Sequence, residues 1–357
     1  MRTFDTSIID RWMKAVWQRR GTDLHCTVGA PPVGRFDGRL EAIEGAPVLE
    51  GDDIERIVAT LLGRESYDAF LEERQHDFGF DWGGEARVRA NAFFQRGHVA
   101  LSLRIIPDTI PTVAELGLPA ICDRLVDLPQ GLVIVTGPTG AGKTTSLAAL
   151  IDAINTRRPA HVITVEEPIE FVHHHKRSLV NQREVGVDCT SFESALRAAL
   201  REDPDVLLVG EMRDLETIAI ALTMAETGHL VFATMHTNDA AQSMDRIVDV
   251  FPAASQNQIR VQLAGSLAAV ISQRLLPRIG GGRVAAFEIL IATSGVRNLV
   301  RDGKSAQLRN MITTGASAGM QTLESSLAEH VLARTIDYET ALAASLFSKE
   351  LQERVGR

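Results

Sequence analysis

Cysteine is scarce in this chain, and the three cysteines present, Cys26, Cys122 and Cys189, lie far apart with no CxxC pair. This scarcity argues against a disulfide framework and a structural zinc site, and it suits a reducing cytosol. Long apolar runs are also missing: no stretch approaches the roughly 18 residues that cross a bilayer, and the N-terminus lacks signal-peptide features. We therefore expect a cytoplasmic protein with no transmembrane segment, whose contact with a membrane is made through a partner.

A surplus of basic residues is missing as well. The formal net charge is −9 at pH 7 and the pI is about 5.6, which argues against direct, sequence-independent binding of nucleic acid. A chain of 357 residues is long for a single hydrophobic core. We predict two domains, at residues 1–106 and 120–357, joined by a linker at 107–119 that contains three prolines.

The first predicted domain has the pattern of a small α+β unit. Apolar spacing predicts an opening helix that includes Ile8 and Ile9, and a second helix over 52–74 that is broken near Gly63. Strands are predicted at 23–28, 86–94 and 98–106, and Asp37-Gly38 is a hairpin signal.

The chain is organised around the stretch 131–155. An apolar run at 132–135 predicts a buried strand, and 137–144 fits G-x-x-x-x-G-K-[ST] at every position. The residues that follow predict an amphipathic helix, because four apolar side chains recur on one face: Leu147, Leu150, Ile151 and Ile154. A glycine-rich turn that merely joins a strand to a helix is the alternative, and the complete spacing disfavours it.

The residue types in this loop suit a triphosphate. Glycines let backbone N–H groups converge on phosphate, and the start of the helix adds unpaired N–H groups and its positive dipole end. Lys143 supplies a point charge for the β- and γ-phosphates of ATP, and the Thr144 hydroxyl can ligate Mg²⁺. The predicted nucleotide-binding residues are Gly137, Pro138, Thr139, Gly140, Ala141, Gly142, Lys143, Thr144 and Thr145.

Two further apolar runs end in carboxylates. The run after Asp205 ends at Glu211, which we expect beside Mg²⁺, directly or through water, at the carboxyl edge of a parallel sheet. The run 161–166 is followed by Glu167 and Glu170, and a carboxylate there could orient or deprotonate the attacking water. Taken alone, this second segment is better explained by a solvated acidic turn.

Strands and helices alternate after the linker, which predicts an α/β fold with a mainly parallel sheet covered on both faces. Helices are predicted at 191–201 and 215–227, and a strand at 230–236. Thr190 and Glu193 form a plausible capping box for the first of these helices. After Asn238 the pattern predicts a mostly helical tail.

Several basic side chains have both a structural and a functional interpretation. His229 and His236 stand at the two ends of a predicted strand, and a lone histidine is more often structural than catalytic. Consecutive histidines at 173–175 alternate in direction along an extended chain, so a metal site there is not expected. Arg87, Arg89 and Arg104 lie on paired strands: they either form a solvated face or supply charge in trans to the nucleotide of a neighbouring subunit.

Four motifs occur in order: GPTGAGKTT, ITVEEPIEF, LREDPDVLLVGEMRDLETI and AETGHLVFATMHT. They resemble the Walker A, Asp-box, Walker B and His-box series of the secretion ATPases of the type II/type IV pilus superfamily. NQREVG, IGGGRVAAFEI, GVRNLVRDGK and GMQTLE are most similar to the PilT type of pilus retraction ATPases within it. Pilus assembly motors commonly carry a tetracysteine zinc motif, which three scattered cysteines cannot supply.

The resemblance implies a RecA-like P-loop NTPase domain after a PAS-like α+β domain, in a hexamer with ATP between subunits. It implies Glu170 as catalytic carboxylate, Glu211 as the Walker B acid, and Arg89 and Arg104 as arginine fingers. His229 and His236 would couple nucleotide state to domain position. The family more usually has Glu-Asp where this chain has Glu166-Glu167, which leaves the role of Glu167 open.

The resemblance implies the function of a homohexameric Mg-ATPase, peripheral at the inner face of the cytoplasmic membrane, which drives type IV pilus retraction and twitching motility. Its expected partners are an inner-membrane platform protein and an accessory retraction ATPase. The alternatives are that the chain is itself an accessory retraction ATPase, or a pilus assembly or type II secretion ATPase, or a nucleic-acid translocase.

Overall fold

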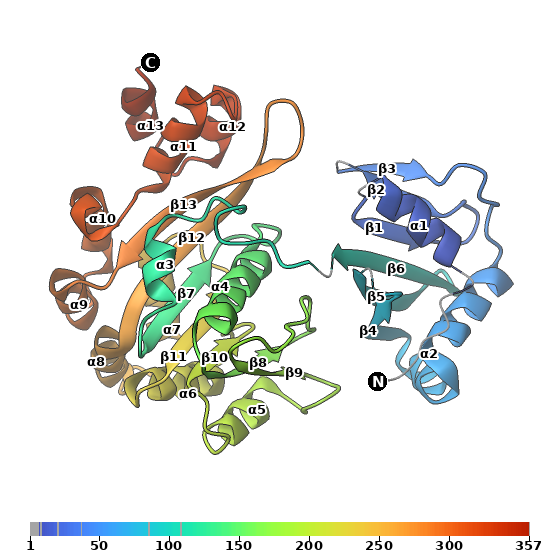
Figure 1. Ribbon diagram of the computed structural model, residues 1–357, viewed down its shortest axis with the longest axis horizontal. Helices are drawn as coiled ribbons and strands as arrows, with labels where there is room; N and C mark the ends of the chain where they lie inside the picture. The colour runs from blue at the N-terminus through green and yellow to red at the C-terminus, as the bar shows by residue number, and fades with distance from the viewer. Residues whose placement is uncertain are drawn as a thin grey trace. The chain divides into compact units, whose positions relative to one another are not determined.

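The computed structural model (Figure 1) describes residues 7, 9–19, 21–36, 38–84, 86–107 and 109–356. The chain divides into two compact units: residues up to Thr109 together with Pro168–Val172, and the stretches Ile110–Glu167 and His173 onward. In the described part of the chain, no helix is both long enough and apolar enough to cross a membrane.

Within the described ranges, the N-terminal unit is an antiparallel sheet with strand order β3-β2-β1-β6-β5-β4 and two helices. Its elements are α1 (Asp10–Gln18), β1 (Asp23–Cys26), β2 (Val33–Phe36), β3 (Arg39–Ala42), α2 (Gly51–Glu73), β4 (Gln75–Trp82), β5 (Ala86–Gln95) and β6 (His98–Pro107). Along β5, Val88 and Ala90 are buried in the core, whereas Arg87 and Arg89 point to the other face. This alternation places the predicted arginines on the polar side of the sheet.

Most elements predicted for this unit are confirmed. The helix α2 is interrupted at Gly63, whose φ of 69° and ψ of 171° are not helical, as the sequence predicts. The strand β4 was not predicted; it pairs with β5 along its whole length, and its glycine and two aspartates hide its alternating pattern. Ile8 and Asp37 lie outside the described residues.

The second unit contains a sheet in the order β13-β12-β7-β11-β10-β8-β9, parallel except between β12 and β13. Its strands are β7 (Gly131–Thr136), β8 (His161–Glu166), β9 (Leu179–Glu184), β10 (Val206–Val209), β11 (Leu230–Met235), β12 (Leu267–Pro277) and β13 (Arg283–Ile291). The four motif strands, β7, β8, β10 and β11, are therefore neighbours in space, with their carboxyl ends at one edge.

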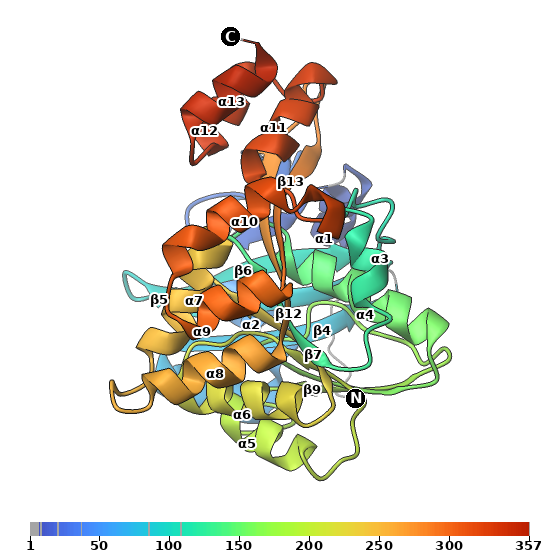
Figure 2. The same ribbon diagram turned by 90° about the vertical axis from the view of Figure 1, so that its left-hand side faces the viewer.

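Helices cover both faces of this sheet (Figures 1 and 2). They are α3 (Ile121–Leu125), α4 (Lys143–Arg157), α5 (Phe192–Ala199), α6 (Leu215–Glu226), α7 (Ala240–Asp249), α8 (Gln256–Ser266), α9 (Ser294–Arg301), α10 (Leu308–Thr314), α11 (Leu323–Leu332), α12 (Tyr338–Ala344) and α13 (Ser348–Val355), with short 3₁₀ turns at Ser305–Gln307 and Ala316–Ala318. Leu132 and Ile134 of β7 pack with α5–α10, whereas Val133 and Val135 pack with α3 and α4. Burial on both faces explains the continuous apolar run of this strand.

Two expectations for this unit are wrong in detail. The cap of α5 is Ser191, which accepts a hydrogen bond from the Ser194 N–H, while the Ser194 side chain reaches back to Ser191. Glu193 pairs instead with Arg197 at 2.8 Å, because residues four apart lie side by side on a helix.

The region after Asn238 is mostly helical, as expected, but the expectation omitted two strands. The strands β12 and β13 pair along 269–277 and 283–291 and extend the sheet beyond β7. Their amphipathic pattern is weak because both strands are largely buried, which makes such runs hard to distinguish from buried helices.

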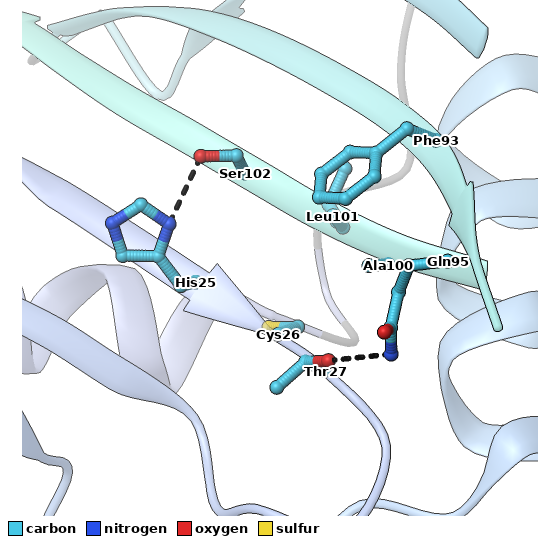
Figure 3. A pocket seen from close by; sticks show the side chains of 8 residues that line it. All are labelled: His25, Cys26, Thr27, Phe93, Gln95, Ala100, Leu101 and Ser102. Carbon is cyan, nitrogen blue, oxygen red and sulfur yellow. Dashed lines mark hydrogen bonds between the residues drawn. The ribbon is translucent and has the colours of Figure 1, made fainter. Parts of the chain in front are cut away.

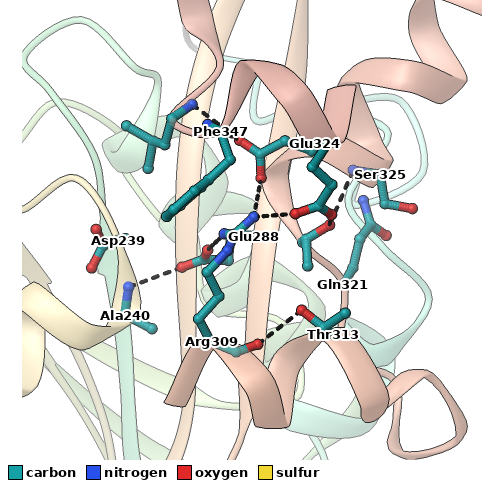
Figure 4. A network of polar contacts seen from close by, with 12 residues as sticks. Asp239, Ala240, Glu288, Arg309, Thr313, Gln321, Glu324, Ser325 and Phe347 are labelled. Carbon is teal, nitrogen blue, oxygen red and sulfur yellow. Dashed lines mark hydrogen bonds and ion pairs between the residues drawn. The ribbon is translucent and has the colours of Figure 1, made fainter. Parts of the chain in front are cut away.

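The helices α11, α12 and α13 pack at the far end of the β12–β13 hairpin (Figure 1). A polar network ties them to the rest of the unit (Figure 4): Arg309 of α10 contacts Glu324 at 2.9 Å and also pairs with Glu350, while its guanidinium lies 3.4 Å from the centre of the Phe347 ring. Glu324 is completely buried and accepts three hydrogen bonds from 345–347. These bonds compensate the desolvation of its charge.

Glu288 of β13 connects this network to α7. Its Oε1 accepts the N–H of Ala240 at 2.9 Å, and its Oε2 lies 3.9 Å from Arg309. Burial raises the pKa of Glu288 to about 7, with Asp239 and Glu324 adding to the effect, while the bond from Ala240 and the charge of Arg309 oppose it. The position of α7, which follows the His-box strand β11, therefore depends on a titratable group.

We predict that the folded protein loses stability through Glu288 as the pH rises. Because the folded pKa of about 7 exceeds the ordinary 4.5, this group's contribution is complete below pH 4.5 and is lost by pH 7 or above. The change is on the order of 2 to 3 kcal/mol in the free energy of unfolding. Glu288→Gln keeps an acceptor for Ala240 and removes the titration. In denaturant unfolding, the free energy of unfolding of the variant should therefore rise relative to that of the wild type between pH 5 and 8. A difference that stays constant with pH would contradict the assignment.

Candidate functional site

The glycine-rich loop joins the carboxyl end of β7 to the start of α4, as the sequence predicts. Gly137 and Gly142 have φ angles of 143° and 86°, which side chains rarely adopt. A Cβ atom at Gly137 would lie 2.2 Å from the carbonyl oxygen of Gln273. The backbone of β12 thus approaches the loop so closely that only glycine fits.

Lys143 is the first residue of α4 and is buried, with 8% exposure. Its Nζ donates to the carbonyls of Gly137 at 2.8 Å and Pro138 at 3.2 Å. Burial lowers the pKa of Lys143, and the nearby charge of Glu211 opposes that shift. Lys143 and the unpaired N–H groups of the first turn of α4 place a positive potential at the loop, which suits phosphate.

Gln273 of β12 holds the loop, and the sequence analysis did not single it out. Its Nε2 donates to the carbonyl of Ala141 at 2.8 Å, and its Oε1 accepts from the Ser146 hydroxyl at 2.8 Å. The side chain is 3% exposed, so these bonds form away from water, where losing them is costly. The polar stretch Ser272-Gln273-Arg274 within an apolar run is the one signal that could have identified it.

A hydroxyl chain joins the carboxyl ends of β7 and β11 beside the loop. Thr136 Oγ1 accepts the N–H of Thr237 at 3.0 Å and contacts the Thr237 hydroxyl at 2.7 Å. That hydroxyl in turn lies 2.6 Å from Ser243 Oγ in α7. The segment after the His-box strand is thereby attached to the strand that leads into the phosphate loop.

Glu211 follows β10 at the same edge of the sheet. Its Oε1 pairs with Arg213 Nε at 2.6 Å, and its Oε2 lies 3.4 Å from His236 Nε2 at the end of β11. A carboxylate and the Thr144 hydroxyl at one edge are oxygen donors of the kind Mg²⁺ prefers. Among the described residues, no group of three His, Cys, Asp or Glu side chains is arranged to hold a metal ion.

Two pockets elsewhere are chemically unlike a phosphate site. One, of about 460 Å³, lies on the N-terminal sheet (Figure 3). It is lined by His25, Cys26, Thr27, Phe93, Gln95, Ala100, Leu101 and Ser102, and so by no lysine or arginine. The other, of about 350 Å³, has four carboxylates in its wall, from Glu167, Glu193, Asp214 and Glu216. Neither offers the cationic surroundings that a triphosphate requires.

Comparison with known proteins agrees with this geometry. Residues 118–281 match the family model described as type II/IV secretion system protein. The chain is 50% identical to the type IV pilus retraction ATPase PilT of Pseudomonas aeruginosa, over 90% of this chain and 93% of that protein. The chain belongs to the PilT family of secretion ATPases.

Two further comparisons support this family assignment. The type IV pilus ATPase PilU of Pseudomonas aeruginosa is 38% identical over 96% of this chain and 90% of its own. A crystal structure of the pilus retraction motor PilT with bound ADP superposes with a TM-score of 0.88, at 46% identity, over 97% of this chain and 99% of the other. The predicted fold class, a P-loop α/β domain with an N-terminal α+β domain, is confirmed, and the chain is an ATP hydrolase by family.

The predicted residues of this PilT-family chain fall into separate groups. The phosphate loop, Glu211 and His236 meet at one edge of the second sheet. His229 lies at the opposite end of β11, about 20 Å away at 3.3 Å per residue, and its Nδ1 lies 3.0 Å from the carbonyl of Met224. This placement gives His229 no direct contact with a phosphate bound at the phosphate loop of the same subunit.

Arg89, Arg104 and Glu170 belong to the N-terminal unit. Arg89 and Arg104 are opposite one another on β5 and β6, where like charges repel. Arg104 pairs with Asp23 at 2.9 Å, and Arg89 Nη1 lies 3.8 Å from Glu170. The arginines that the sequence groups together are thus adjacent, each with a carboxylate nearby.

The segment GVRNLVRDGK, residues 295–304, lies in α9 and the turn that follows. Arg297 Nη1 donates to the carbonyls of Ala264 and Gly265 at 2.6 Å, and its Nε donates to Ala292 at 3.0 Å. A cation at these carbonyls caps the C-terminal end of α8. This arginine therefore has a structural role within its own subunit.

We predict that Gln273→Ala weakens nucleotide binding by roughly tenfold, because the loop loses two buried hydrogen bonds that hold its shape. Titration with a fluorescent ADP analogue measures the affinity. Ser272→Ala is the matched control: Ser272 is the neighbour in β12 and is 4% exposed, and its hydroxyl makes no hydrogen bond to the described residues. Equal affinities in the two variants would show that Gln273 does not support the loop.

Proposed function

We propose that this chain is a Mg-dependent ATPase that assembles into a homohexameric ring and drives retraction of type IV pili. The observation that carries the proposal is the phosphate loop at the carboxyl edge of the sheet. Its Lys143 is buried, and Glu211 lies close enough for its charge to act on the pKa of Lys143. Identity of 50% to a retraction ATPase over nearly the whole chain supports the cellular role.

In this proposal the nine loop residues at 137–145 hold the phosphates of ATP, and Thr144 and Glu211 hold Mg²⁺, partly through water. Glu170 is the carboxylate that orients the attacking water. Residues 107–119 are the linker between a PAS-like domain at 1–106 and the ATPase domain at 120–357. His229, at the far end of β11, transmits the state of the nucleotide to domain position.

Arg89 and Arg104 act in trans on the nucleotide of a neighbouring subunit. Their place on the polar face of an antiparallel sheet, with Arg89 40% and Arg104 59% exposed, leaves them accessible to a second chain. Loss of the γ-phosphate would remove contacts between subunits and so move one domain against the next. The ring would work at the inner face of the cytoplasmic membrane by pulling on a platform protein.

We predict that Lys143→Ala and Arg89→Ala each abolish ATP turnover, whereas a mixture of the two regains part of it. Lys143→Ala subunits still donate Arg89 to an intact loop on an Arg89→Ala neighbour, so mixed rings contain complete sites. Phosphate release by each variant, by the mixture and by unmixed controls tests this, with size-exclusion chromatography to verify assembly. Full turnover by Lys143→Ala would refute the site, and a mixture without activity would refute action in trans.

Retraction is distinguished from its alternatives by the fibres on the cell. We predict that deleting the gene leaves cells with surplus pili that do not retract, because subunits can no longer leave the fibre base. Imaging of labelled pili measures this, and bald cells would instead indicate an assembly motor. Retraction that continues at reduced force would instead indicate an accessory ATPase.

A nucleic-acid translocase on the same core is the remaining candidate. The net charge of −9 speaks against it, and filter binding at low salt decides between the two.

A further inference from the structure

The strands β8 and β9 are parallel neighbours, yet no helix joins them. The chain leaves β8 at Glu166, passes through the segment that carries Glu170, and returns without regular secondary structure to enter β9 at Leu179. Parallel strands are usually joined by a helix, whose packing would hold the connection in place. The middle of this segment belongs to the N-terminal unit, where Arg87 Nε donates to the carbonyl of Ile169 at 2.9 Å, so other contacts must hold its two ends.

Gln182 of β9 joins the two ends of this segment. Its Oε1 accepts the backbone N–H of His173 at 2.7 Å, and its Nε2 donates to Glu166 Oε1 at 3.1 Å. Thr164, which is opposite Gln182 in the register of β8 and β9, donates to the same Glu166 oxygen at 2.6 Å. One amide therefore closes the base of the loop from 167 to 172, using both its acceptor and its donor.

Beyond His173 the returning chain is fixed to α4. Asn155, which is fully buried, donates from Nδ2 to the carbonyl of His174 at 2.7 Å and accepts the N–H of Lys176 at 3.0 Å. The His173 ring is itself buried, with 6% exposure. The free length of the loop is thus limited on one side by Glu166 and on the other by His173, the two groups that Gln182 bridges.

We infer that Gln182 is a positioning residue for ATP hydrolysis, which sets the place of Glu170 by closing the base of the loop that carries it. This inference rests on the proposed role of Glu170 as the catalytic carboxylate. The chemistry requires an amide: a methionine of similar length offers neither bond. Displacement of a reacting group by about 1 Å can cost on the order of 100-fold in rate.

The test compares Gln182→Met with Asn181→Ala in the full-length protein. Asn181 is the exposed neighbour in β9, and its Nδ2 contacts His161 Nε2 at 2.8 Å on the other side of the strand, so it controls for general damage to this edge strand. We expect Gln182→Met to lower kcat about tenfold or more, while KM for ATP stays within about twofold, because the phosphate loop is untouched. Asn181→Ala should leave both values near those of the wild type.

Hydrogen–deuterium exchange gives a readout that does not depend on activity. In Gln182→Met the peptide covering 168–175 should exchange at least several-fold faster than in the wild type and in Asn181→Ala, while the peptide covering 137–145 is unchanged. Unchanged kcat in Gln182→Met, a rise in KM that accounts for its whole loss of activity, or unchanged exchange at 168–175 would each overturn the inference. Full turnover by Glu170→Gln would instead refute the proposed role of Glu170, whatever the exchange measurement shows.

Discussion

The close approach of β12 to the phosphate loop is the constraint on which the site depends. The carbonyl of Gln273 occupies the space that a side chain at Gly137 would need, and its amide holds Ala141 and Ser146 on either side of Lys143. A loop of glycines would otherwise have many conformations, with a matching entropic cost on binding. These contacts with β12 thus restrict the conformation of the loop before nucleotide binds.

Other polar side chains of the ATPase unit also join segments that are separate in the fold. Thr136 and Thr237 join β7 to the segment after β11, Gln182 joins the two ends of the segment bearing Glu170, and Glu288 joins β13 to α7. Each is a polar side chain that satisfies a backbone N–H group of a distant segment. Buried or partly buried polar groups of this kind cost stability when a partner is lost, so the site tolerates little movement at these points.

Much of the site could be predicted because its residues are consecutive. The loop from Gly137 to Thr145 and the carboxylate after β10 are defined by local spacing, and the structure places them together because parallel strands share a carboxyl edge. Gln273 and Gln182 could not be predicted in this way, because their partners are distant in sequence: Ala141 for one, and Glu166 and His173 for the other. Their roles arise only when β12 and β9 take their positions in the sheet.

The sequence by itself determined the order of strands and helices around the phosphate loop, the α/β class and the family, because periodicity and glycine placement are local properties. Tertiary structure alone decided that β12 and β13 extend the sheet, that Gln273 supports the phosphate loop, and that Gln182 bridges Glu166 and His173. The physical reason is that these outcomes depend on which long-range pairings bury the most apolar surface and satisfy the most backbone groups.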